Sequence, residues 1–233
     1  MRLDPQTLSH VKLFAGLTEP TLEDVAAVSL VRHYRHGMLL FSAGEPSEAV
    51  FFVLRGVVRV YRDTPEGHEQ TLQVMRDGDS INVVGFLDEG TYPASAETVA
   101  DSDLAAIRCA DFARLTKAHS DLAWALITEI GHRLRWAQSR IYDFALRSAS
   151  GRVASSLLYL AQQDGKLQDD GSYLLSMPVA HRELGQLAGL SRETLTRMLP
   201  RLRAEGAIHW TEEGHVVVDP QRLKDWLADQ NES

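Results

Sequence analysis

Short apolar runs punctuated by glycine are the feature that most restricts the fold of this sequence. From about Tyr34 to Arg108 the chain consists of β-type runs of four to six residues. Closely spaced short strands predict an antiparallel sandwich or barrel rather than βαβ units. No GxG pair occurs, which argues against a dinucleotide-binding loop. The runs are MLLF, AVFFVL, VVRVY, QTLQVM, SINVV, ASAETV and LAAI, and they are separated by Gly37, Gly44, Gly56, Gly67, Gly78 and Gly90.

Helical patterns lie on both sides of these runs. Residues 1–31 carry apolar residues at three- and four-residue spacing, which predicts a helix. From Asp121 to Arg147 a long helix is predicted without an internal breaker. Its apolar residues follow the spacing 3, 4, 3, 4, 3 between polar flanks, as in the seam of a two-stranded coiled coil. This pattern favours a parallel homodimer, and the alternative is that the stripe packs on its own domain. The seam residues are Ile127, Ile130, Leu134, Ala137, Ile141 and Phe144.

A new pattern begins after the joint near Ser148, which is the best candidate for a hinge. A helix starting at RVASSLLYLAQQ is followed by an exposed polar loop, Asp164–Tyr173. The segment from His181 to Pro200 then fits a helix-turn-helix position by position. Gly185 gives the two helices room to approach, Gly189 supplies the turn, and Ser191 is a good N-cap for the second helix. The predicted shared core consists of Leu184, Ala188, Leu190, Leu195 and Met198.

The opposite face of the second helix carries Arg192, Glu193, Thr196 and Arg197 near its N-terminus. A recognition helix reaches base edges in the major groove from such positions. Arginine can bind guanine O6 and N7 as a fork, and glutamate can accept from cytosine N4. Between Ser191 and Arg203 the chain holds four arginines and one acid, although its formal net charge is −8. We therefore predict double-stranded DNA as the partner of this face, rather than solvent alone.

A wing is predicted directly after the helix-turn-helix. AIHW, TEEG and HVVV read as a β-hairpin with a four-residue turn, and Asp219-Pro220 opens a final helix by cap and first-position proline. A winged helix is indicated by five features together, namely two glycines, a cap, an apolar core and a hairpin. Pro200 lies within the second helix and is expected to bend it beyond the base-reading residues.

Composition limits the remaining classes. Hydrophobic residues make up 44% of the 233 residues and charged residues 24%, which indicates one large or two ordinary globular domains. The N-terminus lacks the pattern of a signal peptide, and no segment reaches the roughly eighteen apolar residues of a membrane span. We therefore expect a cytoplasmic protein that does not use a membrane. The single Cys109 excludes a disulfide framework within the chain and an iron–sulfur cluster.

The chain resembles a family of bacterial transcription factors, that of the cyclic-AMP receptor protein and the fumarate–nitrate regulator. The resemblance covers nearly all of the chain. It rests on AGEPSEAVFFVLRGVVRVY and RDGDSINVVGFLDEG, on the long helix, on SGR at 150–152 and on SRETLTR. It implies an α+β fold with an effector-sensing β-roll domain like a cyclic-nucleotide-binding jelly roll (1–119), a dimerisation helix (120–147) and a winged helix-turn-helix DNA-binding domain (148–233).

The resemblance also implies a DNA site. In the family, residues matching Arg192, Glu193 and Arg197 read the half-site. The presence of both arginines is similar to the cyclic-AMP receptor branch, so an inverted repeat with GTGA-like arms is expected. One departure is Ala180, where the family has a Ser or Thr N-cap. RNA polymerase is an expected further partner. Phosphate contacts are expected from His181, Arg182, Ser191, Thr194 and Arg201.

Cyclic AMP is not the expected effector. Relatives that bind it use a GELG glutamate and an RSA arginine, whereas this chain has Val83 and, depending on the alignment, Pro93 or Ala94. A buried phosphate needs a paired cation, which these residues cannot supply. Ala137 likewise stands where a hydroxyl group would meet the base.

Two alternatives therefore remain for the effector. It is haem or another hydrophobic molecule, or the protein has no ligand at all. TPEGHEQTLQV is similar to a segment of haem members that sense nitric oxide, and His10 and His132 are the candidate haem ligands, although simple exposure explains both. If there is no ligand, the abundance of the protein would regulate its activity. The expected effector pocket consists of Val83, Val84, Phe86, Leu87, Ala94, Ser95, Arg133 and Ala137.

An enzyme and a regulatory module for a protein partner are the two rival classes. An enzyme is not expected, because the sequence contains no GxSxG elbow, P-loop, HExxH motif or paired Cys–His arrangement. A regulatory β-roll that acts on a protein partner would bind no specific duplex. The arginine-rich face of the second helix favours DNA over this second class.

Overall fold

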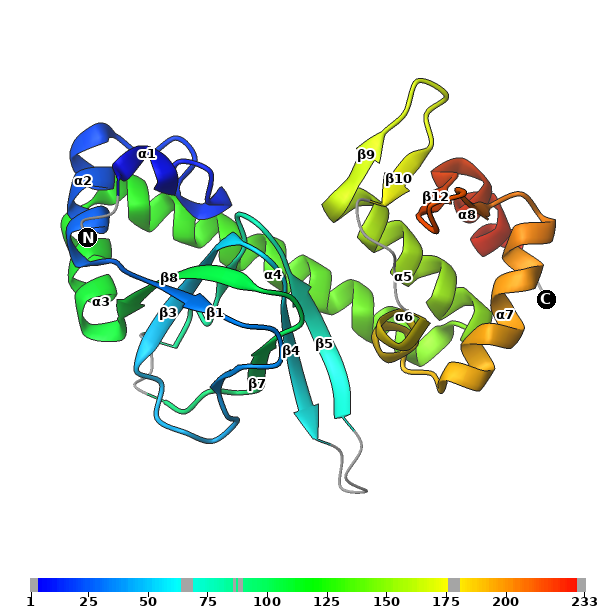
Figure 1. The fold of residues 1–233 in the computed structure, drawn as a ribbon, viewed down its shortest axis with the longest axis horizontal. Coiled ribbons are helices and arrows are strands. Elements are labelled where there is room, and N and C mark those ends of the chain that lie inside the picture. Colours follow the sequence, from blue (N-terminus) through cyan, green and yellow to red (C-terminus); the bar gives the residue numbers. More distant parts are fainter. Residues whose placement is uncertain (1–3, 64–68, 86, 88–89, 176–180, 230–233) are drawn as a thin grey trace. The chain divides into compact units, whose positions relative to one another are not determined.

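The glycine-punctuated runs form two four-stranded sheets in a computed structural model of the chain (Figure 1). The structure describes residues 4–63, 69–85, 87, 90–175 and 181–229, and the side chains of residues 163, 164, 181–183, 186 and 229 lie outside the description. The chain divides into two compact units, Met1–Arg135 and Trp136–Ser233. This division falls inside the long helix, so the domain limits and the hinge near Ser148 stay predictions.

The first unit is the predicted β-roll. Its sheets have the strand orders β1-β8-β3-β6 and β2-β7-β4-β5, and every pairing within them is antiparallel. Apolar side chains from both sheets, such as Phe51, Val58 and Leu104, meet in one buried core. The strands are β1 (Leu30–Tyr34), β2 (Leu39–Phe41), β3 (Ala49–Arg55), β4 (Val58–Asp63), β5 (Glu69–Met75), β6 (Ser80–Ile81), β7 (Ser95–Thr98) and β8 (Ser102–Arg108).

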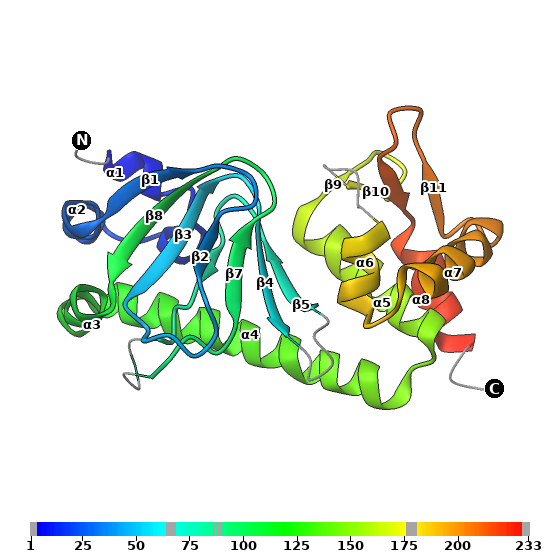
Figure 2. The same ribbon diagram turned by 60° about the horizontal axis from the view of Figure 1, so that its bottom comes forward.

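Helices cover the other face of the first sheet (Figure 2). Phe14 and Phe112 pack there against Phe52 with tilted rings, at centroid distances of 4.6 and 5.9 Å. The helices are α1 (Pro5–Leu8), the short 3-10 helix η1 (Lys12–Phe14), α2 (Glu19–Val28), α3 (Cys109–Ala118) and the first turns of α4 (Ser120–Leu146).

One expectation for the helical segments of this unit was wrong in detail. The predicted helix over residues 1–31 is broken into the three pieces α1, η1 and α2. Gly16, with a φ of +91°, lies between η1 and α2, and α2 begins at Glu19 with Pro20 as its second residue. Strand β1 then begins at Leu30.

The second unit is the predicted winged helix. The predicted wing is confirmed as β11 (Ile208–Trp210) and β12 (Val216–Val218), which pair in an antiparallel hairpin between α7 and α8. The loop expected at 164–173 is wrong in part, because its ends form the paired strands β9 (Gly165–Leu167) and β10 (Tyr173–Leu175). The sheet order is β11-β12-β10-β9. The helices are α5 (Ala149–Asp164), α6 (His181–Ala188), α7 (Arg192–Ala204) and α8 (Pro220–Asp229).

The apolar stripe of α4 is only partly used within its own chain. Ile127, Leu134 and Ile141 are 59%, 58% and 69% exposed, respectively. Ile130, in contrast, packs against the helix-covered core of the first unit, and half-exposed Phe144 touches Gly189 in the second. Three large apolar side chains at coiled-coil spacing thus lack cover in the chain itself. A homodimer stays a prediction that these exposures support.

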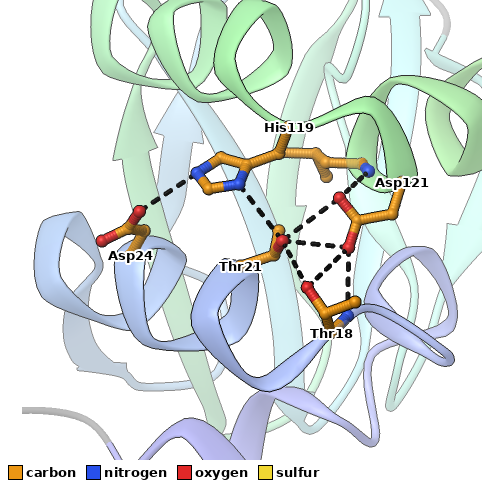
Figure 3. A network of polar contacts seen from close by, with 6 residues as sticks. Thr18, Thr21, Asp24, His119 and Asp121 are labelled. Atoms are coloured by element: carbon orange, nitrogen blue, oxygen red, sulfur yellow. Dashed lines mark hydrogen bonds and ion pairs between the residues drawn. The ribbon is translucent and has the colours of Figure 1, made fainter.

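A polar network joins α2 to the start of α4 (Figure 3). The carboxylate of Asp121 accepts hydrogen bonds from the amide and the hydroxyl of Thr18, both at 3.0 Å, and from the hydroxyl of Thr21 at 2.9 Å. His119 lies between Asp24, 3.0 Å from Nε2, and Thr21, 3.2 Å from Nδ1. The bond from the Thr18 amide is the largest of the contributions that lower the pKa of Asp121 from 3.8 to about 2.

This network predicts a pH-dependent contribution to stability. A carboxyl group whose pKa is lower in the folded state stabilises the fold fully above its ordinary value, and the contribution disappears as the pH falls through the folded-state pKa. We expect Asp121→Asn to lower the free energy of unfolding by about 1 kcal/mol at pH 7. The difference from wild type should shrink between pH 4 and pH 2. Urea unfolding across this pH range measures it.

Asp111→Asn is the matched control, since it removes a carboxyl group that is 38% exposed on α3. A difference between wild type and Asp121→Asn that stays constant from pH 7 to pH 2 would contradict the role given to Asp121.

Candidate nucleic-acid interface

Helices α6 and α7 form the predicted helix-turn-helix around a buried core (Figure 2). Leu184 and Ala188 of α6 and Leu195 of α7 are buried, as expected. Met198 and Leu190 are only half-buried, and the core of α7 is completed instead by residues that sequence reasoning missed, Leu199 and Leu202. These lie four and seven residues after Leu195, so the helical period would have placed them on the same face.

The turn between the helices depends on glycine. Gly189 adopts a φ of +65°, which side chains other than glycine rarely tolerate. A Cβ atom at Gly185 would lie 3.0 Å from the carbonyl oxygen of Leu190, so the close approach predicted for this residue is confirmed. Ser191 is confirmed as the N-cap of α7, and its side chain accepts a hydrogen bond from the amide of Thr194 at 3.2 Å.

The predicted base-reading residues lie together on the exposed side of α7. Arg192, Glu193, Thr196 and Arg197 are all exposed, within the first turns after the N-cap. The hydroxyl of Thr196 donates to the carbonyl oxygen of Arg192 at 2.8 Å, which leaves the oxygen lone pairs of Thr196 facing outward as acceptors. The helix dipole adds positive potential at this end. The face can therefore present donors to base edges and attract phosphates.

The expected phosphate contacts are described unevenly. Arg201 and Ser191 are exposed and Thr194 is half-buried. His181 and Arg182 begin α6, but their side chains lie outside the described part, as does the whole of Ala180. All of these assignments stay predictions.

Pro200 lies within α7, which continues through it to Ala204. Its ring nitrogen cannot donate to the carbonyl oxygen of Thr196. The later part of the helix is held by the wing, where the guanidinium of Arg203 lies 5.9 Å from the ring centroid of Trp210. Sequence reasoning did not identify this contact.

The predicted effector residues differ in their surroundings. Val83 is fully buried in the core beneath the helices, so it serves packing rather than a pocket wall, which departs from the expectation. Val84 and Leu87 are 41% and 59% exposed, and Phe86 lies outside the described residues. Ala137 belongs to the other unit.

The remaining polar candidates have partners inside the protein. Ser95 is buried and accepts a hydrogen bond from the amide of Ala43 at 3.0 Å, and its neighbour Ala94 is buried as well. Arg133 donates to the backbone carbonyl and the hydroxyl of Ser80 and forms an ion pair with Glu129 at 2.7 Å. Its guanidinium is thus already neutralised by a carboxylate.

Aromatic side chains form part of the core of the roll. Tyr92 stacks on Phe41 at a centroid distance of 3.8 Å, and its hydroxyl accepts from the amides of Glu48 and Ala49. Burial raises the pKa of Tyr92. Asn82, with a φ of 62°, donates to Ala49 at 3.0 Å from the turn that precedes Gly85.

Neither of the two candidate haem ligands is buried. His10 and His132 are both exposed, and Nδ1 of His132 lies 3.3 Å from the guanidinium of Arg135. Within the part of the chain that the structure describes, no group of three His, Cys, Asp or Glu residues could hold a metal ion. A cavity of about 1070 Å³ does open in the first unit, lined by residues such as Arg32, Tyr34 and Arg108 rather than by the predicted set.

Comparisons with known proteins match both units. Residues 31–119 match the cyclic nucleotide-binding domain family and residues 151–226 the Crp-like helix-turn-helix domain family. The cyclic AMP receptor protein of Thermus thermophilus is 32% identical over 197 residues, which cover 84% of this chain and 87% of that protein. The cAMP-activated global transcriptional regulator CRP of Salmonella typhimurium is 29% identical over 82% of this chain and 90% of its own.

Solved structures show the same fold. The catabolite activator protein of Thermus thermophilus is 30% identical, with a TM-score of 0.54 over 94% of this chain and 99% of that one. FixK2 from Bradyrhizobium japonicum superposes with a TM-score of 0.74 over 85% of this chain and 96% of its own, at 23% identity.

Among the described helices, none is long and apolar enough to cross a membrane.

The residue at the expected ribose and phosphate position predicts that cyclic AMP does not bind. A ligand present at 1,000 times its dissociation constant would stabilise the protein by about 4 kcal/mol. We therefore expect millimolar cyclic AMP to leave the thermal unfolding midpoint unchanged, since Val83 is apolar and fully buried and cannot bind a polar group of the nucleotide. The cyclic AMP receptor protein of Thermus thermophilus is the positive control. A saturable rise of the midpoint with cyclic AMP would contradict this assignment.

Proposed function

Because this chain belongs to the CRP/FNR family of DNA-binding transcription regulators, we propose that it acts as a homodimer that reads an inverted repeat with GTGA-like arms. The observation that carries the proposal is the exposed face of α7, where Arg192, Glu193, Thr196 and Arg197 follow directly after the Ser191 cap. Its chemistry is that of recognition and not of catalysis, since an arginine fork and a carboxylate match the edges of guanine and cytosine.

The dimer follows from α4 and from the geometry of duplex DNA. Ile127, Leu134 and Ile141 expose apolar surface that a second copy of the helix would cover. Two recognition helices held one helical turn apart, about 34 Å, fit successive major grooves on one face of the duplex. An inverted repeat is the DNA counterpart of such a two-fold symmetric protein.

The sensor unit is proposed to respond to a molecule other than cyclic AMP, or to none. Apolar, buried Val83 argues against a nucleotide, while exposed Val84 and Leu87 leave an apolar surface for haem or another hydrophobic effector. The alternative, regulation by the abundance of the protein alone, needs no further site. On the basis of family membership, we also propose that the protein contacts RNA polymerase and is located in the cytoplasm.

A second candidate function is a β-roll module that acts on a protein partner. It would leave the exposed arginines of α7 without a role, so DNA is favoured. The two readings differ in one property, because only the DNA-binding protein shows sequence-specific affinity that falls steeply with salt.

The reading face predicts specific losses on substitution. We expect Arg192→Met and Arg197→Met each to weaken binding to a GTGA-containing inverted repeat by about 1–3 kcal/mol per half-site, because each removes a fork to guanine. Affinity for a duplex whose guanines are replaced should change much less. Fluorescence anisotropy at a fixed salt concentration measures both.

The matched control is Arg62→Met, which removes the same charge from an exposed position on β4. If Arg62→Met and Arg192→Met weaken binding equally, the effect is one of net charge, and the base-reading role is wrong.

The apolar stripe predicts that a charge on α4 separates the dimer. Leu134→Glu buries a carboxylate at the proposed seam and should raise the dimer dissociation constant by roughly a hundredfold. Sedimentation velocity measures this, with Leu167→Glu as the control, since Leu167 is similarly exposed on β9. A wild-type monomer at micromolar concentration, or a dimer indifferent to Leu134→Glu, would contradict the seam.

A further inference from the structure

The last turns of α4 reach the helix-turn-helix within the second unit. The guanidinium of Arg140, on α4, makes a close hydrogen bond to the carbonyl oxygen of Leu187. Arg152, on α5, donates through Nε to the carbonyl oxygen of Ala188 at 2.9 Å. These two carbonyls are the last of α6, directly before the turn at Gly189.

Phe144 fills the space between these two arginines. Its ring centroid lies 4.9 Å from the guanidinium carbon of Arg140 and 5.7 Å from that of Arg152. A Cβ atom on Gly189 would lie 2.6 Å from Cε1 of the ring. The ring thus sits against the backbone of the turn at a point where only a glycine fits.

The end of a helix such as α6 is a place that attracts a cation. The last carbonyl groups of a helix have no partner within the helix, and they carry the negative end of its dipole. A cation placed there is stabilised most when it is shielded from water, and the Arg140 side chain is only 13% exposed. Nearby Asp143 is also held in place, because its buried carboxylate accepts hydrogen bonds from Arg147 of α4 at 2.6 Å and from Ser155 of α5 at 3.2 Å.

We propose that Arg140, Phe144 and Arg152 form a clamp that fixes the turn of the helix-turn-helix to the end of α4. They are positioning residues, because they touch the backbone at the end of α6 and not the DNA. The proposal rests on the function proposed above and deepens it, since it names the residues through which a movement of α4 would reach α7.

The clamp acts at the point where it has most effect on α7. Gly189 lies three residues before Arg192, and the turn between them is held by a hydrogen bond from the amide of Leu190 to the carbonyl oxygen of Gly185 at 2.8 Å. Bidentate contacts to base edges tolerate displacements of only about 0.5 Å. Releasing the end of α6 therefore changes specific binding first, whereas phosphate attraction depends on charges that stay in place.

The test compares Arg140→Met with two variants of full-length protein. Arg140→Met keeps the aliphatic stem and removes the donors. Arg140→Lys restores one charged donor and should recover part of the effect. Arg135→Met is the matched control, since Arg135 is an exposed arginine on the same helix whose described contact is with His132 on that helix. Binding to specific and non-specific duplexes and hydrogen exchange of residues 184–196 are measured for each.

We expect Arg140→Met to weaken specific binding by about tenfold or more, with non-specific affinity changed less than twofold. Amides of the turn and of the first turn of α7 should exchange faster, while residues 49–63 of the roll stay protected. Unchanged exchange in the turn, or an equal loss of specific and non-specific affinity, would overturn the clamp.

The exchange measurement separates this proposal from the one on which it rests. If the wild-type protein binds no specific duplex, the proposed function fails, but faster exchange in Arg140→Met would still establish the clamp. If the wild type binds specifically and Arg140→Met leaves both exchange and binding unchanged, the clamp fails alone.

Discussion

The burial of one face of α7 is the constraint on which the rest of this structure depends. Leu195, Leu199 and Leu202 lie against α6 and the helices around it, and all are at least 96% buried. With 3.6 residues per turn, this docking turns positions 193, 196 and 197 toward the solvent side, and Arg192 is exposed at the first residue of the helix. Burying three leucines is worth several kcal/mol. Apolar packing thus supplies the energy that holds a charged face in one orientation.

The same constraint explains how an acidic protein can present a DNA-binding face. Net charge governs solubility and long-range attraction, whereas recognition depends on the charges that meet the groove. Here the cations are gathered on one exposed side of a short helix, and its N-terminus adds to their field. Acidic surface elsewhere would discourage other approaches of the polyanion. The negative net charge of the chain and the basic helix α7 are therefore compatible.

How much the sequence predicts depends on the kind of signal. Most strands of the roll, the wing and the α7 cap follow from apolar runs, glycine punctuation and the type of residue at 191, so these were predicted. Strands β1, β9 and β10 were not. Val83 could not be placed, because a valine in a core and one lining a pocket look alike in a sequence. Tyr92 and Arg140 owe their roles to contacts with distant residues, at Phe41 and Leu187, that no local pattern encodes. Tertiary packing decides such cases.

The most direct test of the account is a selection of wild-type protein against random DNA duplexes at near-physiological salt. The orientation of α7 predicts enrichment of an inverted repeat with guanines in both GTGA-like arms and half-site centres about 10 base pairs apart. Such a result would show that the exposed arginines read bases and that two copies act together. Enrichment of no sequence, or of a motif that lacks those guanines, would contradict the central claim that this face of α7 reads DNA.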